Sequence, residues 1–153
     1  MIDLPPEPRI RTRVKVFYFD TDAAGVVHNV AYLRLVEVGR SELAEKLGWS
    51  LAEMGKSGIV PVLARTEIDY RKPARLGEAL LIESSLTRLE RVRFVIETSI
   101  RKEDEYETLV YCRQTLVTIR ISDGRPQAVP ESWVRAYPHL RAVRNDSKTK
   151  SDS

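Results

Sequence analysis

DTDAAGVVHNVAYLRLVEVGR, residues 20–40, joins a polar turn to one long helical pattern. The pattern continues to Leu47 without a proline, and Gly48 follows it as a stop signal. We therefore predict a helix over residues 29–47 that is entered directly from the turn. Its apolar positions recur at helical spacing on one arc: Tyr32, Leu33, Val36, Gly39, Leu43, Ala44 and Leu47.

Strand patterns lie on both sides of this helix. Before the turn, residues 11–19 form a run of β-branched, aromatic and charged side chains that is typical of a strand. A short helical turn is expected over residues 51–55. Four further strand patterns cover about residues 59–70, 79–89, 92–101 and 106–121. A strand, a helix and then a four-stranded meander predict an α+β domain, with the helix lying across an antiparallel five-stranded sheet.

The chain length of 153 residues fits one domain and is too short for two of ordinary size. We expect this domain to cover residues 1–140, and residues 141–153 to form a polar, disordered tail. A single cysteine excludes an intramolecular disulfide framework. Two histidines argue against a multi-histidine metal site.

No apolar run reaches the roughly 18 residues that a membrane span needs. The first residues carry prolines and charges where a secretion signal would be apolar. We therefore expect a cytoplasmic protein with no membrane span.

The net charge is +3, and the tail, with four bases and two acids, holds most of it. The nearly neutral body argues against a nucleic-acid partner, although binding through the basic tail remains a rival hypothesis.

A single helix can cover only one face of a five-stranded sheet, and the sheet has two edges. An uncovered face and an unpaired edge favour self-association. We therefore expect a homo-oligomer.

Two charges interrupt the apolar arc of the predicted helix. Arg40 falls within the arc and Glu37 lies at its edge, so the two side chains are three positions apart and can meet. A buried charge is costly unless it is paired. The pattern favours a structural ion pair over a catalytic role for Glu37.

The turn ahead of the helix carries the densest chemistry in the chain. Asp20 and Asp22 could be turn formers or helix caps, but Asp22 is several residues too early to cap a helix that begins near Asn29. Gly25 allows the backbone to approach a ligand closely. A helix N-terminus presents free N–H groups and a partial positive charge, which can stabilise a carbonyl oxygen as it gains negative charge. A carboxylate beside such a carbonyl could attack it or activate water.

At these residues the chain resembles the hotdog-fold acyl-CoA thioesterases, in the branch of the 4-hydroxybenzoyl-CoA thioesterase family that includes the Tol-Pal-associated enzymes. The matching elements are Asp-x-Asp-x-x-Gly-Val-Val over residues 20–27, Tyr32, and Glu37-x-x-Arg40. The segment YRKPARLG, residues 70–77, is also similar. The resemblance covers about residues 11–133.

The resemblance implies hydrolysis of an aromatic or short- to medium-chain acyl-CoA to the free acid and coenzyme A. It implies that Asp22 is the catalytic carboxylate, as nucleophile or general base, and that Asp20 supports the loop. The N–H of Asn29 would polarise the thioester carbonyl. The residues expected to contact substrate are Gly25, Val27, His28, Asn29 and Glu37.

Family members are dimers that often pair into tetramers, with the site between subunits, so the resemblance implies a dimer or a dimer of dimers, that is, a homotetramer. It implies no metal, and no cofactor beyond the coenzyme A of the substrate. His28 stands where close relatives commonly carry an aromatic residue, and Asn29 where some carry histidine. These two departures from the family pattern bear on the identity of the substrate more than on the type of reaction.

Basic residues cluster at one predicted hairpin. Arg88, Arg91 and Arg93 are candidates to hold the phosphates of coenzyme A, which guanidinium groups suit well, and a solvated turn is the equally weighted alternative. Arg71 and Lys72 form a similar candidate patch.

Three further hypotheses compete with a thioesterase. The principal alternative is a non-catalytic acyl-CoA or acyl-carrier binding module on the same fold, and a hotdog hydratase or dehydratase is compatible with the fold alone. A serine hydrolase is disfavoured, because Ser84 and Ser85 have no neighbouring histidine or glycine-rich elbow in sequence. Cys112, within the last strand pattern, is expected to be a buried, inert thiol.

Overall fold

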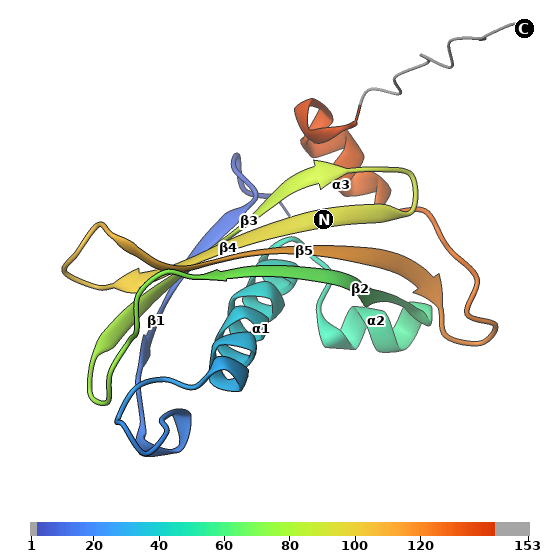
Figure 1. Cartoon of the computed structure of the whole chain (residues 1–153). Coiled ribbons are helices and arrows are strands. Elements are labelled where there is room, and N and C mark those ends of the chain that lie inside the picture. Colours follow the sequence, from blue (N-terminus) through green and yellow to red (C-terminus); the bar gives the residue numbers. More distant parts are fainter. Residues whose placement is uncertain (1–2, 143–153) are drawn as a thin grey trace, which may run out of the picture.

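The computed structural model describes residues 3–142 as a curved antiparallel sheet with one long helix against its inner face (Figure 1). The strands are β1 (Arg9–Lys15), β2 (Ile59–Tyr70), β3 (Ala79–Leu89), β4 (Arg93–Lys102) and β5 (Thr108–Arg120). The helices are α1 (Asn29–Lys46), α2 (Leu51–Ser57) and α3 (Glu131–Ala136). The α+β prediction is therefore confirmed, in the hotdog arrangement that the resemblance implies.

The order of the strands across the sheet is β1-β3-β4-β5-β2. The predicted four-stranded meander is therefore wrong: β3, β4 and β5 form a meander of three, and β2 pairs with the far side of β5. The connection over residues 71–78 crosses from one side of the sheet to the other. As a result, β1 and β2 are the two edges of the sheet.

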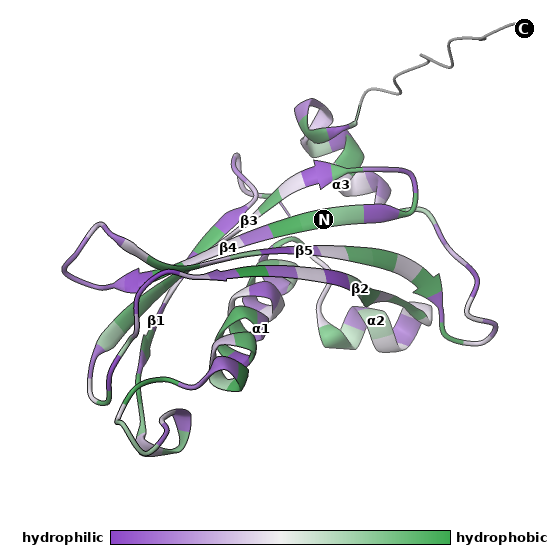
Figure 2. Ribbon diagram, in the orientation of Figure 1, coloured by the Kyte–Doolittle hydropathy of each residue, from purple (hydrophilic) through white to green (hydrophobic). Residues whose placement is uncertain are grey.

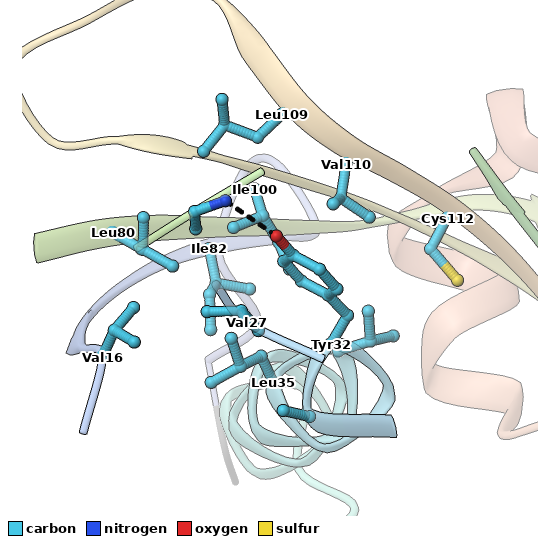
Figure 3. Packing of buried hydrophobic residues seen from close by; sticks show 13 residues of the cluster. Val16, Val27, Tyr32, Leu35, Leu80, Ile82, Ile100, Leu109, Val110 and Cys112 are labelled. Atoms are coloured by element: carbon cyan, nitrogen blue, oxygen red, sulfur yellow. Dashed lines mark hydrogen bonds between the residues drawn. The ribbon is translucent and has the colours of Figure 1, made fainter. Parts of the chain in front are cut away.

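The inner face of the sheet follows the expected alternation. On β4, for example, Phe94, Ile96, Thr98 and Ile100 are all buried, while the intervening residues from Glu97 onward are partly exposed. In α1 the buried side includes Tyr32, Val36 and Leu43, and hydrophobic and hydrophilic residues alternate around this helix (Figure 2). Figure 3 shows Tyr32 and Leu35 of α1 directed at the strands.

Helix α1 approaches β3 closely at Gly39. A Cβ atom added there would collide with Ser84 Oγ and would lie 2.8 Å from Ile82 Cγ2. Glycine is required at this position because the helix backbone and β3 leave no room for a side chain. The close contact fixes the height of α1 above the sheet.

Three local predictions are corrected by the structure. The first strand ends at Lys15 rather than residue 19, because the Asp20 carboxylate accepts the N–H of Phe17 and closes a 3₁₀ turn over Tyr18–Asp20. On α1, Leu33 is 40% exposed and does not belong to the buried arc. Helix α3 was not expected; its buried Trp133 donates a hydrogen bond to the Leu47 carbonyl at the end of α1.

Part of the predicted tail belongs to the domain. Arg141 pairs with Leu89 in a short parallel bridge, and the N–H of Ala142 donates to the Leu89 carbonyl at 2.9 Å. The rest of the predicted tail, residues 143–153, lies outside the described residues.

Candidate active site

The turn between the first 3₁₀ segment and α1 is closed by its own backbone. The N–H of Asp22 donates to the Val26 carbonyl at 2.9 Å, and the N–H of Gly25 donates to the Asp22 carbonyl at 3.0 Å. Gly25 adopts φ 74°, a left-handed conformation that favours glycine. Thr21 pairs with Val27 across the turn, so Asp22 is folded back toward the residues that enter α1.

The turn is also fixed to the connection between β2 and β3. The N–H of Val27 donates to the Ala74 carbonyl at 2.8 Å, and the N–H of Leu76 donates to the Gly25 carbonyl at 3.1 Å. The buried Tyr32 hydroxyl of α1 accepts the N–H of Ala74 at 2.9 Å (Figure 3). Gly25 and Val27 thus shape a rigid turn, and their predicted contact with substrate stays a prediction.

Asp20 anchors this turn through buried hydrogen bonds. It is 1% exposed, and its carboxylate accepts hydrogen bonds from Arg34 Nη2 at 2.5 Å and from the N–H of Phe17 at 3.1 Å. Its carbonyl accepts the N–H of His28 at 3.0 Å. All of these bonds are internal to the protein, which agrees with the supporting role that the resemblance implies for Asp20.

Asp22 has the opposite surroundings. Its side chain is exposed, and only Oδ1 is engaged, by the N–H of Ala24 at 2.8 Å. Within residues 3–142 no other hydrogen bond holds the second carboxylate oxygen. The turn therefore fixes the direction of the carboxylate and leaves one oxygen open for chemistry.

Helix α1 begins seven residues after Asp22, at Asn29. His28 is the N-cap: its Nδ1 accepts the N–H of Ala31 at 3.0 Å, and its Nε2 lies 3.4 Å from the Phe19 carbonyl. A ring whose Nδ1 accepts carries its proton on Nε2, which can then donate to Phe19. This gives His28 a structural role in starting the helix; its predicted contact with substrate is a separate expectation.

The N–H of Asn29 is the first of the helix. First-turn N–H groups have no partner within a helix, and eighteen aligned peptide units place a partial positive charge at this end. Asn29 and Asp22 are both exposed. Tyr70 of β2 reaches the same point, with its hydroxyl 3.5 Å from the Asn29 carbonyl.

Glu37 and Arg40 form a weaker pair than predicted. Their closest charged atoms are 4.0 Å apart, and the Glu37 side chain is 65% exposed. The stronger partner of Arg40 is Gln114 on β5, whose Oε1 accepts from Nη1 at 2.6 Å. Burial lowers the pKa of Arg40 from its ordinary value, and the charge of Glu37 opposes this shift. Arg40 is thus tied to the sheet, whereas Glu37 faces outward two helical turns beyond Asn29.

The structure does not bring the arginine cluster to Asp22 within one chain. Arg88, Arg91 and Arg93 lie at the hairpin after β3, whereas the turn contacts the connection that precedes β3. The eleven residues of β3, at about 3.3 Å each, separate the two ends by more than 30 Å. Arg75, which the sequence analysis did not single out, is exposed and pairs with Val26 of the turn. The sequence feature that could have indicated Arg75 is its position in the segment of residues 70–77, which is similar to the thioesterase family.

Among residues 3–142, no group of three histidine, cysteine, aspartate or glutamate side chains is placed to hold a metal ion. No helix in the same part of the chain is long and apolar enough to cross a membrane. Ser84, a residue considered for a serine hydrolase, is buried and hydrogen bonded to Thr98.

Comparison with known proteins gives a consistent result. The sequence model of the Thioesterase-like superfamily matches residues 18–137. The acyl-CoA thioester hydrolase YbgC of Escherichia coli O6:H1 is 29% identical over 132 residues, which are 83% of this chain and 94% of that protein. A probable thioesterase from Bartonella henselae is 28% identical, with a TM-score of 0.73 over 80% of this chain and 99% of that one. A 1,4-dihydroxy-2-naphthoyl-CoA thioesterase from Synechocystis, 23% identical, shares the fold with a TM-score of 0.77 over 86% of this chain and 97% of that chain.

Proposed function

Since this chain belongs to the thioesterase-like superfamily and is a thioester hydrolase, we propose that it cleaves acyl-CoA esters with Asp22 as the catalytic carboxylate. The observation that carries this proposal is the pairing of an exposed carboxylate, fixed in a rigid turn, with the free N-terminus of α1. The first supplies a nucleophile or base, and the second supplies donors for the carbonyl oxygen.

The reaction follows from these two parts. The N–H of Asn29 and the partial charge of the helix stabilise the thioester oxygen as it becomes negative. The open oxygen of Asp22 either attacks the carbonyl carbon, giving a mixed anhydride that water then hydrolyses, or removes a proton from the attacking water. In both cases the carbon–sulfur bond breaks, coenzyme A leaves as the thiol, and the acid is released.

The site is completed by a second copy of the chain. Nine of the twelve exposed large apolar and aromatic side chains of residues 3–142 belong to the segment before α1, to α1, to β2 or to the connection after β2: Phe17, Tyr18, Phe19, Val30, Leu33, Val62, Leu63, Tyr70 and Leu76. The edge formed by β1 is blunted by Arg9, Arg11, Arg13 and Lys15, whereas the edge formed by β2 is longer and largely apolar. Pairing through β2 would cover this surface, and dimers could pair further into the expected homotetramer.

This pairing also supplies a role for the distant arginines. A partner subunit can bring a second set of side chains to the site, so Arg88, Arg91 and Arg93 remain candidates for coenzyme A across the interface. Arg75 is the candidate from the same chain. We expect the enzyme to act in the cytoplasm, where coenzyme A esters are its substrates.

The test is release of coenzyme A from a panel of aromatic, short-chain and long-chain acyl-CoAs, followed with a chromogenic thiol reagent. A thioesterase releases one thiol per ester, repeatedly. Stoichiometric binding of the esters without turnover would instead support the acyl-CoA binding module.

A further inference from the structure

A cavity lies toward the opposite end of α1 from Asp22. Its volume is about 590 Å³, within the range of sites for small organic ligands. The walls come from α1, the start of α2 and the inner face of the sheet. Its deep part is apolar and includes Leu43, Leu47, Trp49, Phe94, Leu116 and Trp133.

This cavity is built from side chains that otherwise form the core. Leu43, Phe94, Leu116 and Trp133 are each at most 2% exposed, and yet all four line it. A packed interior leaves few voids larger than a water molecule, and space next to apolar side chains forfeits packing energy. An apolar pocket of this size, which opens to the surface beside Glu37, Ser41 and Ala52, is therefore a feature that an apolar ligand would fill.

One face of α1 leads from the proposed catalytic site to the cavity. Val30, Leu33, Glu37, Ser41 and Ala44 follow one another at spacings of three or four residues, so they share a face. Val30 is 63% exposed and Leu33 is 40% exposed. The last three of the series line the cavity.

Strand β2 accompanies this helix face along the same path. Tyr70 contacts Asn29 at the start of α1. At the other end of β2, Val60 and Pro61 line the cavity together with Ala44. The helix face and the edge strand thus connect the first turn of α1 to the cavity.

The distance from Asn29 to the cavity sets the minimum length of an acyl chain that can reach it. A helix rises 1.5 Å per residue, so Glu37, at the near end of the cavity, lies about 12 Å along the axis from Asn29. An extended chain advances roughly 1.2 Å per bond, as the polypeptide backbone itself does. An acyl chain whose carbonyl sits at Asn29 therefore reaches the cavity only after about ten bonds.

We propose that this cavity binds the distal part of long acyl chains, and that the enzyme accepts unbranched fatty acyl groups longer than about ten carbons. The inference rests on the proposed function, since the carbonyl position at Asn29 comes from it. Of the charged residues that line the cavity, Glu37 and Glu45 are exposed, and the partly buried guanidinium of Arg40 is hydrogen bonded to Gln114 of β5. The rest of the lining is largely apolar and suits a hydrocarbon tail.

Specific activity is expected to rise steeply with acyl-chain length, but only over the lengths that reach the cavity. Burial of one methylene group in an apolar site tightens binding by about fourfold at best. Chains shorter than the threshold gain nothing from the cavity. Specific activity should therefore rise between octanoyl-CoA and hexadecanoyl-CoA, with the rise beginning near decanoyl-CoA.

A binding experiment tests the inference without any turnover. The chain contains two tryptophans, Trp49 and Trp133, and both line the cavity. We expect hexadecanoic acid that carries bromine at its terminal carbon to quench their fluorescence strongly, because bromine quenches on contact. The 2-bromo isomer should quench weakly, since its bromine remains near the carboxylate, and bromobutanoic acid should not quench.

The variant Ala44→Phe places a ring in the cavity, and Ala52→Trp narrows it from α2. Each should abolish quenching by the terminally brominated acid and lower turnover of hexadecanoyl-CoA at least tenfold, while turnover of short esters stays within twofold. Ala136→Phe, on the exposed side of α3, is the matched control and should change neither.

The outcomes separate the two proposals. Equal quenching by both bromo isomers, or loss of short-chain and long-chain turnover in equal measure in folded Ala44→Phe and Ala52→Trp, would overturn the role of the cavity and leave the thioesterase intact. Terminal-bromine quenching in a protein that cleaves no ester would support the cavity and overturn the proposed function.

Discussion

Two carboxylates that stand two residues apart have different tasks because their surroundings differ. Asp20 is enclosed and fully hydrogen bonded, whereas Asp22 is exposed with one free oxygen. Asp20 therefore holds the geometry on which Asp22 depends. Removal of the Asp20 carboxylate is therefore expected to lower the stability of the fold first.

We expect Asp20→Ala to destabilise the protein by about 2 kcal/mol, because it leaves the N–H of Phe17 and the guanidinium of Arg34 without their charged acceptor. A thermal melt should show a fall of several degrees. The control is Asp104→Ala, at an exposed aspartate in the hairpin between β4 and β5. Equal melting temperatures for the two variants would contradict the anchoring role.

The single cysteine gives a second prediction at this scale. Burial raises the pKa of Cys112 to about 11, and the nearby charge of Arg40 lowers it only in part. The reactive form is the thiolate, so a raised pKa leaves almost none at pH 8. The native protein should not react with a chromogenic thiol reagent at that pH, and the unfolded chain should give one equivalent; rapid reaction of the folded protein would show that Cys112 is accessible.

At the scale of the elements, the contact between α1 and β3 depends on the missing side chain of Gly39. We expect Gly39→Ala to cost about 1–3 kcal/mol, since a methyl group collides with Ser84 and Ile82. Gly55→Ala is the matched control, because α2 leaves open space around Gly55. It should be neutral or stabilise by up to about 1 kcal/mol. Urea unfolding of both variants measures the difference, and a stabilising Gly39→Ala would contradict the close packing.

The edge strand β2 gives the prediction for assembly. Leu63 is 44% exposed on that strand, and a charge there should prevent a second copy from pairing. Leu63→Lys is expected to lower the molar mass measured by light scattering to that of a 17.5 kDa monomer and to reduce turnover. Ile121→Lys, at an exposed apolar residue just beyond β5, should keep the wild-type mass. A wild-type mass for Leu63→Lys would rule out pairing through β2.

Local patterns predicted the bounds of several elements well. The ranges 59–70 and 79–89 coincide with β2 and β3, and the helix was expected one residue longer than α1. These patterns depend on neighbours in sequence. The end of β1 was missed because it depends on the Asp20 carboxylate, and the place of β2 was missed because strand order depends on contacts that no local pattern encodes.

At the scale of the whole molecule, the parts of the site that depend on neighbours in sequence could be predicted, and the parts that depend on the fold could not. The turn and the helix start lie within ten residues of one another, so sequence reasoning could place Asp22 before Asn29. Arg75 reaches the turn only through the fold, and the cavity at the far end of α1 is formed by helices and strands together. Neither could be found from spacing along the chain.

Together, the structure describes a thioester hydrolase in which one helix serves two purposes. Its first turn follows the turn that carries the exposed carboxylate of Asp22, and its later turns form a wall of the apolar cavity. The middle of α1 packs against β3 at Gly39, and Trp133 of α3 donates a hydrogen bond to the Leu47 carbonyl just beyond its last residue. The central claim is that Asp22 performs the chemistry in this arrangement.

The most direct measurement is kcat/KM of Asp22→Asn for the acyl-CoA that the wild type cleaves fastest, with Asp104→Asn as the control for an exposed aspartate. Asparagine keeps the acceptor for Ala24 and removes the charge, so folding and assembly should be unchanged. We predict a loss of about 10²–10⁴-fold for Asp22→Asn and none for the control. A correctly folded and assembled Asp22→Asn that keeps kcat/KM within about twofold of wild type would contradict the account.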